Sequence, residues 1–108
     1  FYTLDEARNL VEYCGQHNML LIPEIDMPGH SAAFERTFGC DMQSEKGTQI
    51  LRDILDEVCS ALDVPYIHIG TDEVQFTNPE FVPRMSAAKG KRSSLGILDG
   101  TISRARLI

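Results

Sequence analysis

The sequence predicts an α/β fold with parallel strands, and three observations support this prediction. Segments with helical and with strand character alternate along the chain. Each expected strand is continuously apolar, which is typical of strands buried on both faces of a parallel sheet. Each is also followed by acids or a histidine, and α/β sheets and (β/α)8 barrels build their active sites at the carboxyl ends of strands. We therefore expect polar side chains from two strands to meet at one edge of the sheet.

The first expected helix begins at a capping box, Thr-Leu-Asp-Glu, at residues 3–6. The Thr3 hydroxyl can accept a hydrogen bond from the backbone of Glu6, whose carboxylate can reach back to the Thr3 amide. Apolar residues then recur at helical spacing, and the run ends at about His17. This pattern predicts an amphipathic helix.

Two expected strands and two further helices follow. Residues 19–22 are an uninterrupted apolar run before the breaker Met-Pro-Gly-His at 27–30. A helix with one apolar face at 50–62 precedes a second strand at 66–69. Asn-Pro then opens a third helix at 78–85. The order of elements favours a right-handed parallel arrangement.

Two adjacent acids, Asp72 and Glu73, come directly after the second strand. Successive side chains on a regular strand face opposite ways, so both acids can face one pocket only if the chain leaves the sheet at residues 70–71. Neighbouring carboxyl groups repel each other when ionised, which favours one of them keeping the proton that a glycosidic oxygen needs to leave. The first strand delivers three more polar residues to the same level: Glu24, Asp26 and His30. This context favours a functional cleft over a solvated loop.

Each histidine also has a structural interpretation. His30 alone is more often a hydrogen-bonding loop residue than a catalytic one. His68 lies inside its expected strand, which predicts a packed, hydrogen-bonded side chain. His17 stands where a helix is expected to end, in a favourable position relative to the helix dipole.

Charge and cysteine spacing exclude several classes of protein. Sixteen acids and ten bases give a net charge of −6, and no basic stripe is present, so we expect no nucleic-acid partner. Cys14, Cys40 and Cys59 lack the CxxC spacing of a zinc or redox site and are interpreted as ordinary thiols in or near a core. No apolar run reaches transmembrane length, no secretion signal is visible, and the compartment stays open.

Two segments carry a family resemblance. LIPEIDMPGH (21–30) and YIHIGTDEV (66–74) are similar to the signature segments of glycoside hydrolase family 20, the β-N-acetylhexosaminidases, and YTLDEARNLVEYC (2–14) resembles the family's lead-in helix. The resemblance covers residues 1–88. It implies a partial (β/α)8 TIM barrel, from about helix 2 through strand 4 plus the following helix. A partial barrel leaves sheet edges open, so we expect the chain alone to be inactive and to associate.

The resemblance also implies a reaction, the hydrolysis of terminal non-reducing N-acetylglucosamine or N-acetylgalactosamine from β-glycosides. The mechanism would be substrate-assisted and retaining, with attack by the sugar's own acetamido oxygen. Asp72 would orient that acetamido group, and Glu73 would protonate the leaving oxygen and then activate water. Three residues would support the pair: His30, Asp26 and Glu24. The expected partner is a glycan, with no metal and no organic cofactor; the resemblance leaves the preferred hexosamine, the natural glycan and the oligomeric state open.

The sequence departs from the family pattern by lacking tryptophan altogether, and it also departs at Thr71 and in its tail. Thr71 stands where many family members have glycine. Residues 89–108 carry one acid and five bases, against fifteen acids and five bases in residues 1–88, and they do not read as the next barrel strand. This tail is interpreted as a reading-frame slip or as a divergent or disordered terminus.

Two other functions remain open. The chain is alternatively an inert or carbohydrate-binding remnant of the family. It is also alternatively part of a metal-dependent barrel hydrolase, because its carboxylates and histidines are ligand types that metals use, although no HExxH spacing is present.

Overall fold

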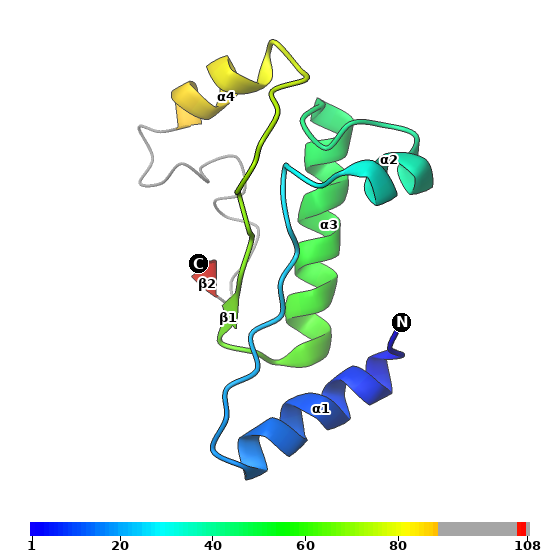
Figure 1. Cartoon of the computed structure of the whole chain (residues 1–108), viewed down its shortest axis with the longest axis vertical. Coiled ribbons are helices and arrows are strands. Elements are labelled where there is room, and N and C mark those ends of the chain that lie inside the picture. The colour runs from blue at the N-terminus through cyan, green and yellow to red at the C-terminus, as the bar shows by residue number, and fades with distance from the viewer. Residues whose placement is uncertain (89–105, 108) are drawn as a thin grey trace.

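The computed structural model describes residues 1–88 and 106–107 of the chain. Most of the tail, residues 89–105 and 108, lies outside the described residues, and with it the interpretation of that tail. The described elements are α1 (Leu4–Gln16), α2 (Ala32–Phe38), α3 (Glu45–Leu62), β1 (Tyr66–Ile67), α4 (Phe81–Ala88) and β2 (Arg106–Leu107). Figure 1 shows α3 running along two extended segments, with α1 below its C-terminal end.

Helix α1 confirms the predicted capping box. The Thr3 hydroxyl accepts from the Glu6 amide at 3.3 Å, and the Glu6 carboxylate accepts from the Thr3 amide at 2.7 Å. These bonds satisfy backbone donors that the first turn of a helix otherwise leaves unpaired. The Arg8 side chain donates to the carbonyl of Ala61 at 2.9 Å and so links α1 to α3.

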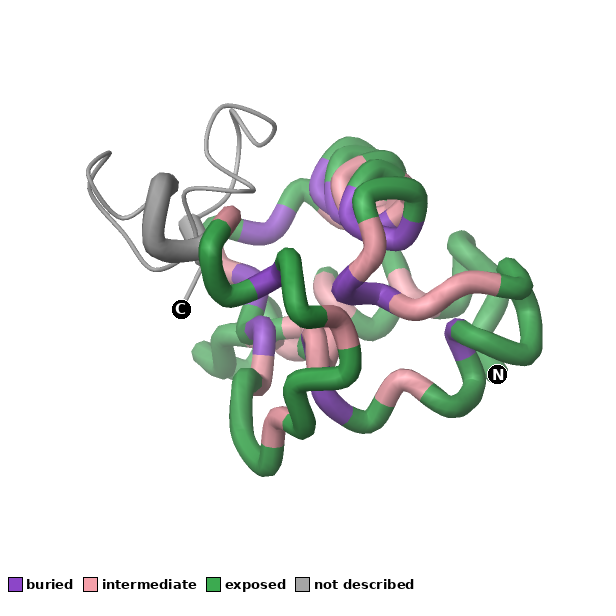
Figure 2. Tube along the Cα trace, turned by 90° about the horizontal axis from the view of Figure 1, so that it is seen from above, coloured by how far each residue is buried: buried purple, intermediate pink, exposed green. Residues whose placement is uncertain are grey.

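Helix α3 supplies the centre of the core, as its apolar face predicts. Ser44 caps its first turn by accepting from the Gly47 amide at 3.0 Å. Leu51 and Leu55 are buried, and the buried residues of Figure 2 follow this helix face and the segments beside it. The core cluster consists of Met27, Phe34, Met42, Leu51, Leu55, Cys59, Val64, Ile67 and Ile69.

Residues 23–27 run parallel to residues 66–69, as the predicted parallel sheet requires. The Ile25 amide donates to the His68 carbonyl at 2.9 Å, and the His68 amide donates to the Pro23 carbonyl at 2.9 Å. Strand β1 also pairs in parallel with β2, through Tyr66 with Arg106 and Ile67 with Leu107. Figure 1 shows β2 on the side of β1 away from residues 23–27. The β1 segment therefore has parallel neighbours on both sides.

The expectation that residues 19–22 form a strand buried on both faces is wrong. They are not in a strand, and Met19, Leu20 and Ile22 are 52%, 57% and 40% exposed. In the described part of the chain, hydrogen bonding to residues 66–69 begins only at Pro23, because that segment is short and starts after Pro65. Without a ladder beside it, the apolar run has no sheet to be buried in.

Helix α2 was not expected from the sequence. Phe34 and Phe38 lie one turn apart with ring centroids at 4.7 Å, and Gly39 ends the helix in the left-handed conformation. Helix α4 begins at Phe81 rather than at residue 79. The Asn78 side chain accepts from the Glu80 amide at 2.9 Å in the turn just before this helix, so Asn78 is not its N-cap as predicted.

The cysteines match their predicted state, whereas His68 does so in part. The three cysteines are free thiols, with Cys59 buried and the other two partly buried, as predicted. His68 is hydrogen-bonded, its Nδ1 accepting from the Gly70 amide at 3.1 Å, but its side chain is 47% exposed and not packed. In the described part of the chain, no helix combines the length and apolarity needed to cross a membrane.

Candidate functional site

The first arm of the site is the turn that follows residues 23–27. The Met27 amide donates to the Ile69 carbonyl at 3.0 Å, so pairing with the β1 segment continues as far as Asp26 and Met27. The chain then turns through Gly29, and His30 has a positive φ of 48°. This turn returns the His30 imidazole to Asp26, whose carboxylate accepts a hydrogen bond from Nδ1.

The second arm is the segment after β1, which leaves the sheet at residues 70–71 as the two adjacent acids require. Gly70 and Thr71 have φ values of 65° and 81°, and Glu73 has 49°. Left-handed backbone is costly for residues other than glycine, by about 1–3 kcal/mol each, and such strain concentrates at functional sites. The Thr71 amide is held by the Asp26 carboxylate at 3.3 Å. The departure from strand geometry is therefore stabilised by the first arm.

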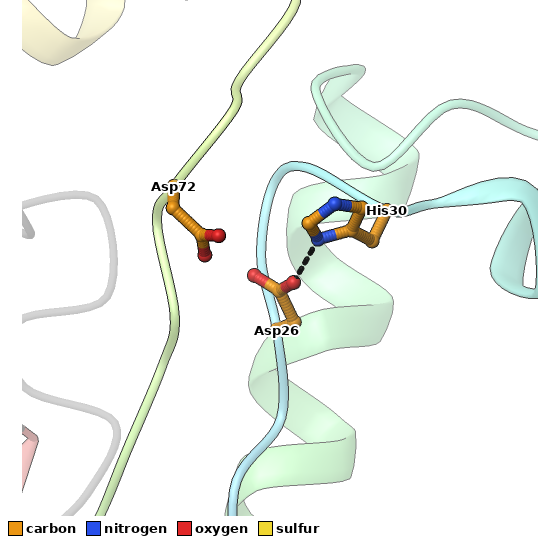
Figure 3. Close-up of side chains that lie close together, drawn as sticks. All are labelled: Asp26, His30 and Asp72. Atoms are coloured by element: carbon orange, nitrogen blue, oxygen red, sulfur yellow. Dashed lines mark hydrogen bonds and ion pairs between the residues drawn. The ribbon is translucent and has the colours of Figure 1, made fainter.

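His30 is the meeting point of the two arms. Its Nε2 lies 3.3 Å from Oε2 of Glu73, while Nδ1 faces Asp26. The nearest carboxylate and imidazole atoms of Asp26, His30 and Asp72 all lie within 4.8 Å of one another. Figure 3 shows the three side chains pointing toward a common space between the arms. Both adjacent acids thus approach one imidazole.

The electrostatics of the site follow from these contacts. The hydrogen bond from His30 is the main cause that lowers the pKa of Asp26, and the Thr71 amide also contributes. The hydrogen bonds to Asp26 and then to Glu73 raise the pKa of His30, as does the negative charge of Asp72. The site therefore favours an imidazolium among carboxylates.

Glu24 lies apart from this group. Its carboxylate is 3.5 Å from Nδ1 of His68, with which it also shares a parallel bridge. Residues two apart on an extended segment share a face, so Glu24 and His68 form a polar layer next to the one that contains Asp26. Four of the five predicted site residues therefore come together, and the fifth lies beside His68.

Two glycines allow the arms to approach each other. A Cβ added to Gly29 would lie 2.9 Å from the Asp72 carbonyl oxygen, and a Cβ on Gly70 would collide with the Asp26 carboxylate. Because neither position has room for a side chain, both glycines are required by the geometry of the site.

Gln43, which lies just before α3 and is 2% exposed, was not predicted as a residue of the site. Its side chain donates to the Gln75 carbonyl at 2.5 Å and accepts from the Thr77 amide at 3.1 Å, so it holds the chain just beyond Glu73. A contact between residues more than 30 positions apart leaves no local pattern that sequence reasoning can use.

The spacing of Asp26, His30 and Asp72 is also compatible with a divalent cation. However, carboxylates already engage both ring nitrogens of His30. A cation held by the imidazole would have to displace one of them.

Comparisons with known proteins agree on one family. Residues 1–40 match the model of the glycosyl hydrolase family 20 catalytic domain. The chain is 35% identical over 96 residues to a beta-hexosaminidase of Vibrio furnissii and 31% identical over 94 residues to one of Porphyromonas gingivalis. Each alignment covers 68% of this chain but only 16% and 12% of those proteins. The chain thus spans less than a fifth of either relative.

Solved structures agree with the sequence comparisons. The beta-N-acetylhexosaminidase of Bacteroides fragilis superposes with a TM-score of 0.66 and 28% identity, covering 82% of this chain and 21% of that one. A glycoside hydrolase family 20 beta-N-acetylglucosaminidase superposes with a TM-score of 0.60 and 19% identity. This superposition covers 100% of this chain and 37% of that one. At 19% identity, this second similarity is evidence for a shared fold alone.

Proposed function

Because this chain belongs to glycoside hydrolase family 20 as part of its catalytic domain, we propose that the full-length protein containing it removes terminal N-acetylhexosamine residues from β-glycosides. Within that protein, residues 23–27 and 66–69 are the third and fourth strands of a (β/α)8 barrel. Residues 1–88 run from about helix 2 through strand 4 and the next helix. Asp26, His30, Asp72 and Glu73 then lie at the carboxyl ends of the strands, where barrel enzymes place their active sites.

One observation carries this proposal: two acids adjacent in sequence approach the same imidazole. A substrate-assisted reaction needs no protein nucleophile across the sugar ring, so it suits neighbouring carboxylates. The acetamido oxygen attacks the anomeric carbon as the bond to the leaving oxygen breaks. Glu73 gives its proton to that oxygen, and Asp72 stabilises the positive charge that develops on the acetamido group. Glu73 then takes a proton from the water that opens the cyclic intermediate.

His30 and Asp26 support this chemistry without touching the sugar. Asp26 holds Nδ1 of His30, which leaves Nε2 directed at the Glu73 carboxylate. An imidazole oriented in this way fixes the position of Glu73 and compensates electrostatically for the change in charge of Glu73 during the reaction. Glu24, paired with His68, supports the strand end one layer away.

The test uses the full-length protein and a matched pair of substrates. We expect release of p-nitrophenol from the β-N-acetylglucosaminide and little from the β-glucoside, which differs by lacking the acetamido group. We also expect inhibition by a thiazoline that mimics the cyclised intermediate. Equal hydrolysis of both substrates would contradict substrate assistance. We expect the 108-residue chain alone to release no p-nitrophenol.

The metal-dependent alternative has one observation in its favour, the spacing of Asp26, His30 and Asp72. Chelation separates the two functions. Loss of glycosidase activity in a chelator, with recovery on adding a divalent cation, would favour a metal-dependent hydrolase. Activity unaffected by chelator and abolished by the thiazoline supports the proposed reaction.

A further inference from the structure

The segment that carries the two acids has little backbone support of its own. Asp72, Glu73 and residues 75–77 are exposed. Among the described residues, residues 72–77 make no backbone-to-backbone hydrogen bond. Such a segment is expected to be mobile unless side chains from elsewhere hold it.

The Gln43 side chain supplies that support. Its Nε2 donates to the Gln75 carbonyl at 2.5 Å, and its Oε1 accepts from the amides of Thr77 and Asn78 at 3.1 and 3.3 Å. One buried amide group therefore satisfies three backbone groups of the segment. The first of them is two residues from Glu73.

Gln43 is itself held rigidly. Its backbone amide donates to the Asp41 side chain at 2.8 Å, and its carbonyl accepts from the Arg84 guanidinium of α4. Ser44, the next residue, caps α3, which contributes three of the nine buried residues of the core cluster. The other Asp41 carboxylate oxygen accepts from the Thr77 hydroxyl. The segment after Glu73 is thus tied to the fixed N-terminal end of α3.

We propose that Gln43 is a positioning residue that holds Asp72 and Glu73 beside His30 by clamping residues 75–78 to the start of α3. The proposal rests on the proposed function for its consequence in catalysis. Its structural part, the ordering of Glu73, is independent of any activity. Gln43 lies outside the Asp26–His30–Asp72 group and acts on the acids only through the segment that carries them.

Three variants separate hydrogen bonding from packing. Gln43→Met keeps the length of the side chain and removes all three hydrogen bonds to the segment. Gln43→Glu keeps the acceptors for the Thr77 and Asn78 amides but places a buried carboxylate oxygen against the Gln75 carbonyl, two acceptors with no proton between them. Gln49→Met is the matched control, because Gln49 is exposed on α3 and its side chain, among the residues that the structure describes, bonds Asp53 and Arg52 on the same helix.

The first measurement is the NMR order parameter of the Glu73 amide in the 108-residue chain. We expect it to fall from about 0.85 to below about 0.6 in Gln43→Met, and to stay unchanged in Gln49→Met. In the full-length protein we expect Gln43→Met to lower kcat by about tenfold to about a hundredfold with KM nearly unchanged. Gln43→Glu should show a loss of similar size, because its carboxylate oxygen repels the Gln75 carbonyl. A fall in kcat at constant KM distinguishes positioning from a general loss of stability.

The outcomes are distinguishable. A folded Gln43→Met protein with wild-type kcat and a wild-type order parameter at Glu73 overturns the proposal. If Gln43→Met does not fold, Gln43→Asn decides, because its amide group is one methylene too short to reach all three backbone groups of the segment: an unchanged Glu73 order parameter there also overturns the proposal. If the wild-type full-length protein cleaves no hexosaminide, the proposed function fails while the order parameters still test the clamp.

Discussion

Nε2 of His30 lies 3.3 Å from Oε2 of Glu73, although 43 positions separate the two residues in the sequence. The contact joins the ends of two parallel segments, and Asp26 on the other side of the imidazole completes a chain of three groups. This relationship makes specific predictions for catalysis, for stability as a function of pH, and for the backbone that brings the groups together.

Glu73→Gln should lower kcat of the full-length protein by about 10²-fold to about 10⁴-fold on a disaccharide of β-linked N-acetylglucosamine. The loss should be smaller for the p-nitrophenyl glycoside, because nitrophenolate leaves without a proton. Steady-state rates on both substrates measure the difference. Glu57→Gln, an exposed acid on α3, is the control. An equal loss on both substrates would show that Glu73 is not the proton donor.

The Asp26–His30 pair should stabilise the fold most between about pH 4 and about pH 6.5. The hydrogen bond from His30 lowers the pKa of Asp26 below its ordinary 3.8, so that contribution is present above 3.8 and lost as pH falls through the folded pKa. Hydrogen bonding to Asp26 raises the pKa of His30 above 6.5, so its contribution is present below 6.5 and lost as pH rises through the folded pKa.

Urea unfolding of the wild type and of Asp26→Asn from pH 3 to pH 9 measures this contribution. The difference in unfolding free energy should peak in the stated window. In a His30→Asn background the peak should vanish, because the partner is gone. A difference that is flat with pH would mean that the two groups are not coupled.

Thr71→Gly should stabilise the chain by about 1 kcal/mol. Thr71 is β-branched and has a φ of 81°, a conformation that glycine adopts without steric cost. The hydrogen bond to the Asp26 carboxylate is donated by the backbone amide of residue 71, so it survives the change. Thr37→Gly in α2 is the matched control and should destabilise by about 1 kcal/mol, because glycine weakens a helix. Destabilisation by Thr71→Gly would contradict the left-handed turn.

Leu55→Ala should cost about 2–5 kcal/mol of unfolding free energy, because Leu55 is 0% exposed at the centre of α3. Leu20→Ala, at a side chain that is 57% exposed, should change it by less than about 0.5 kcal/mol. Chemical denaturation of both variants gives the comparison. A large loss in Leu20→Ala would indicate that residues 19–22 are covered in solution, as in the association expected from open sheet edges.

Capping and apolar periodicity, which are local features of the sequence, predicted helices α1 and α3. The capping box at Thr3 led to α1 at nearly its observed bounds. The apolar face around Leu51 and Leu55 led to α3 and its C-terminal end, although α3 begins at Glu45 rather than near residue 50. Continuous apolarity at residues 19–22 predicted burial that the structure does not provide, because burial depends on a neighbouring strand. The brief Phe34–Phe38 pattern of α2 was missed because seven residues carry too few apolar repeats to stand out.

The amino-acid sequence alone specifies which polar groups the site contains and their order, since Glu24, Asp26 and His30 follow one expected strand and Asp72 and Glu73 the other. Parallel strands end at one edge, which is why their convergence was predictable. The folded chain adds three features: Glu24 lies beside His68, Thr71 takes a left-handed backbone, and Gln43 holds the segment beyond Glu73. Each depends on atoms that folding brings together across 30 or more positions of the sequence, including the Thr71 amide, which the Asp26 carboxylate holds from 45 positions away, so no local pattern encodes it.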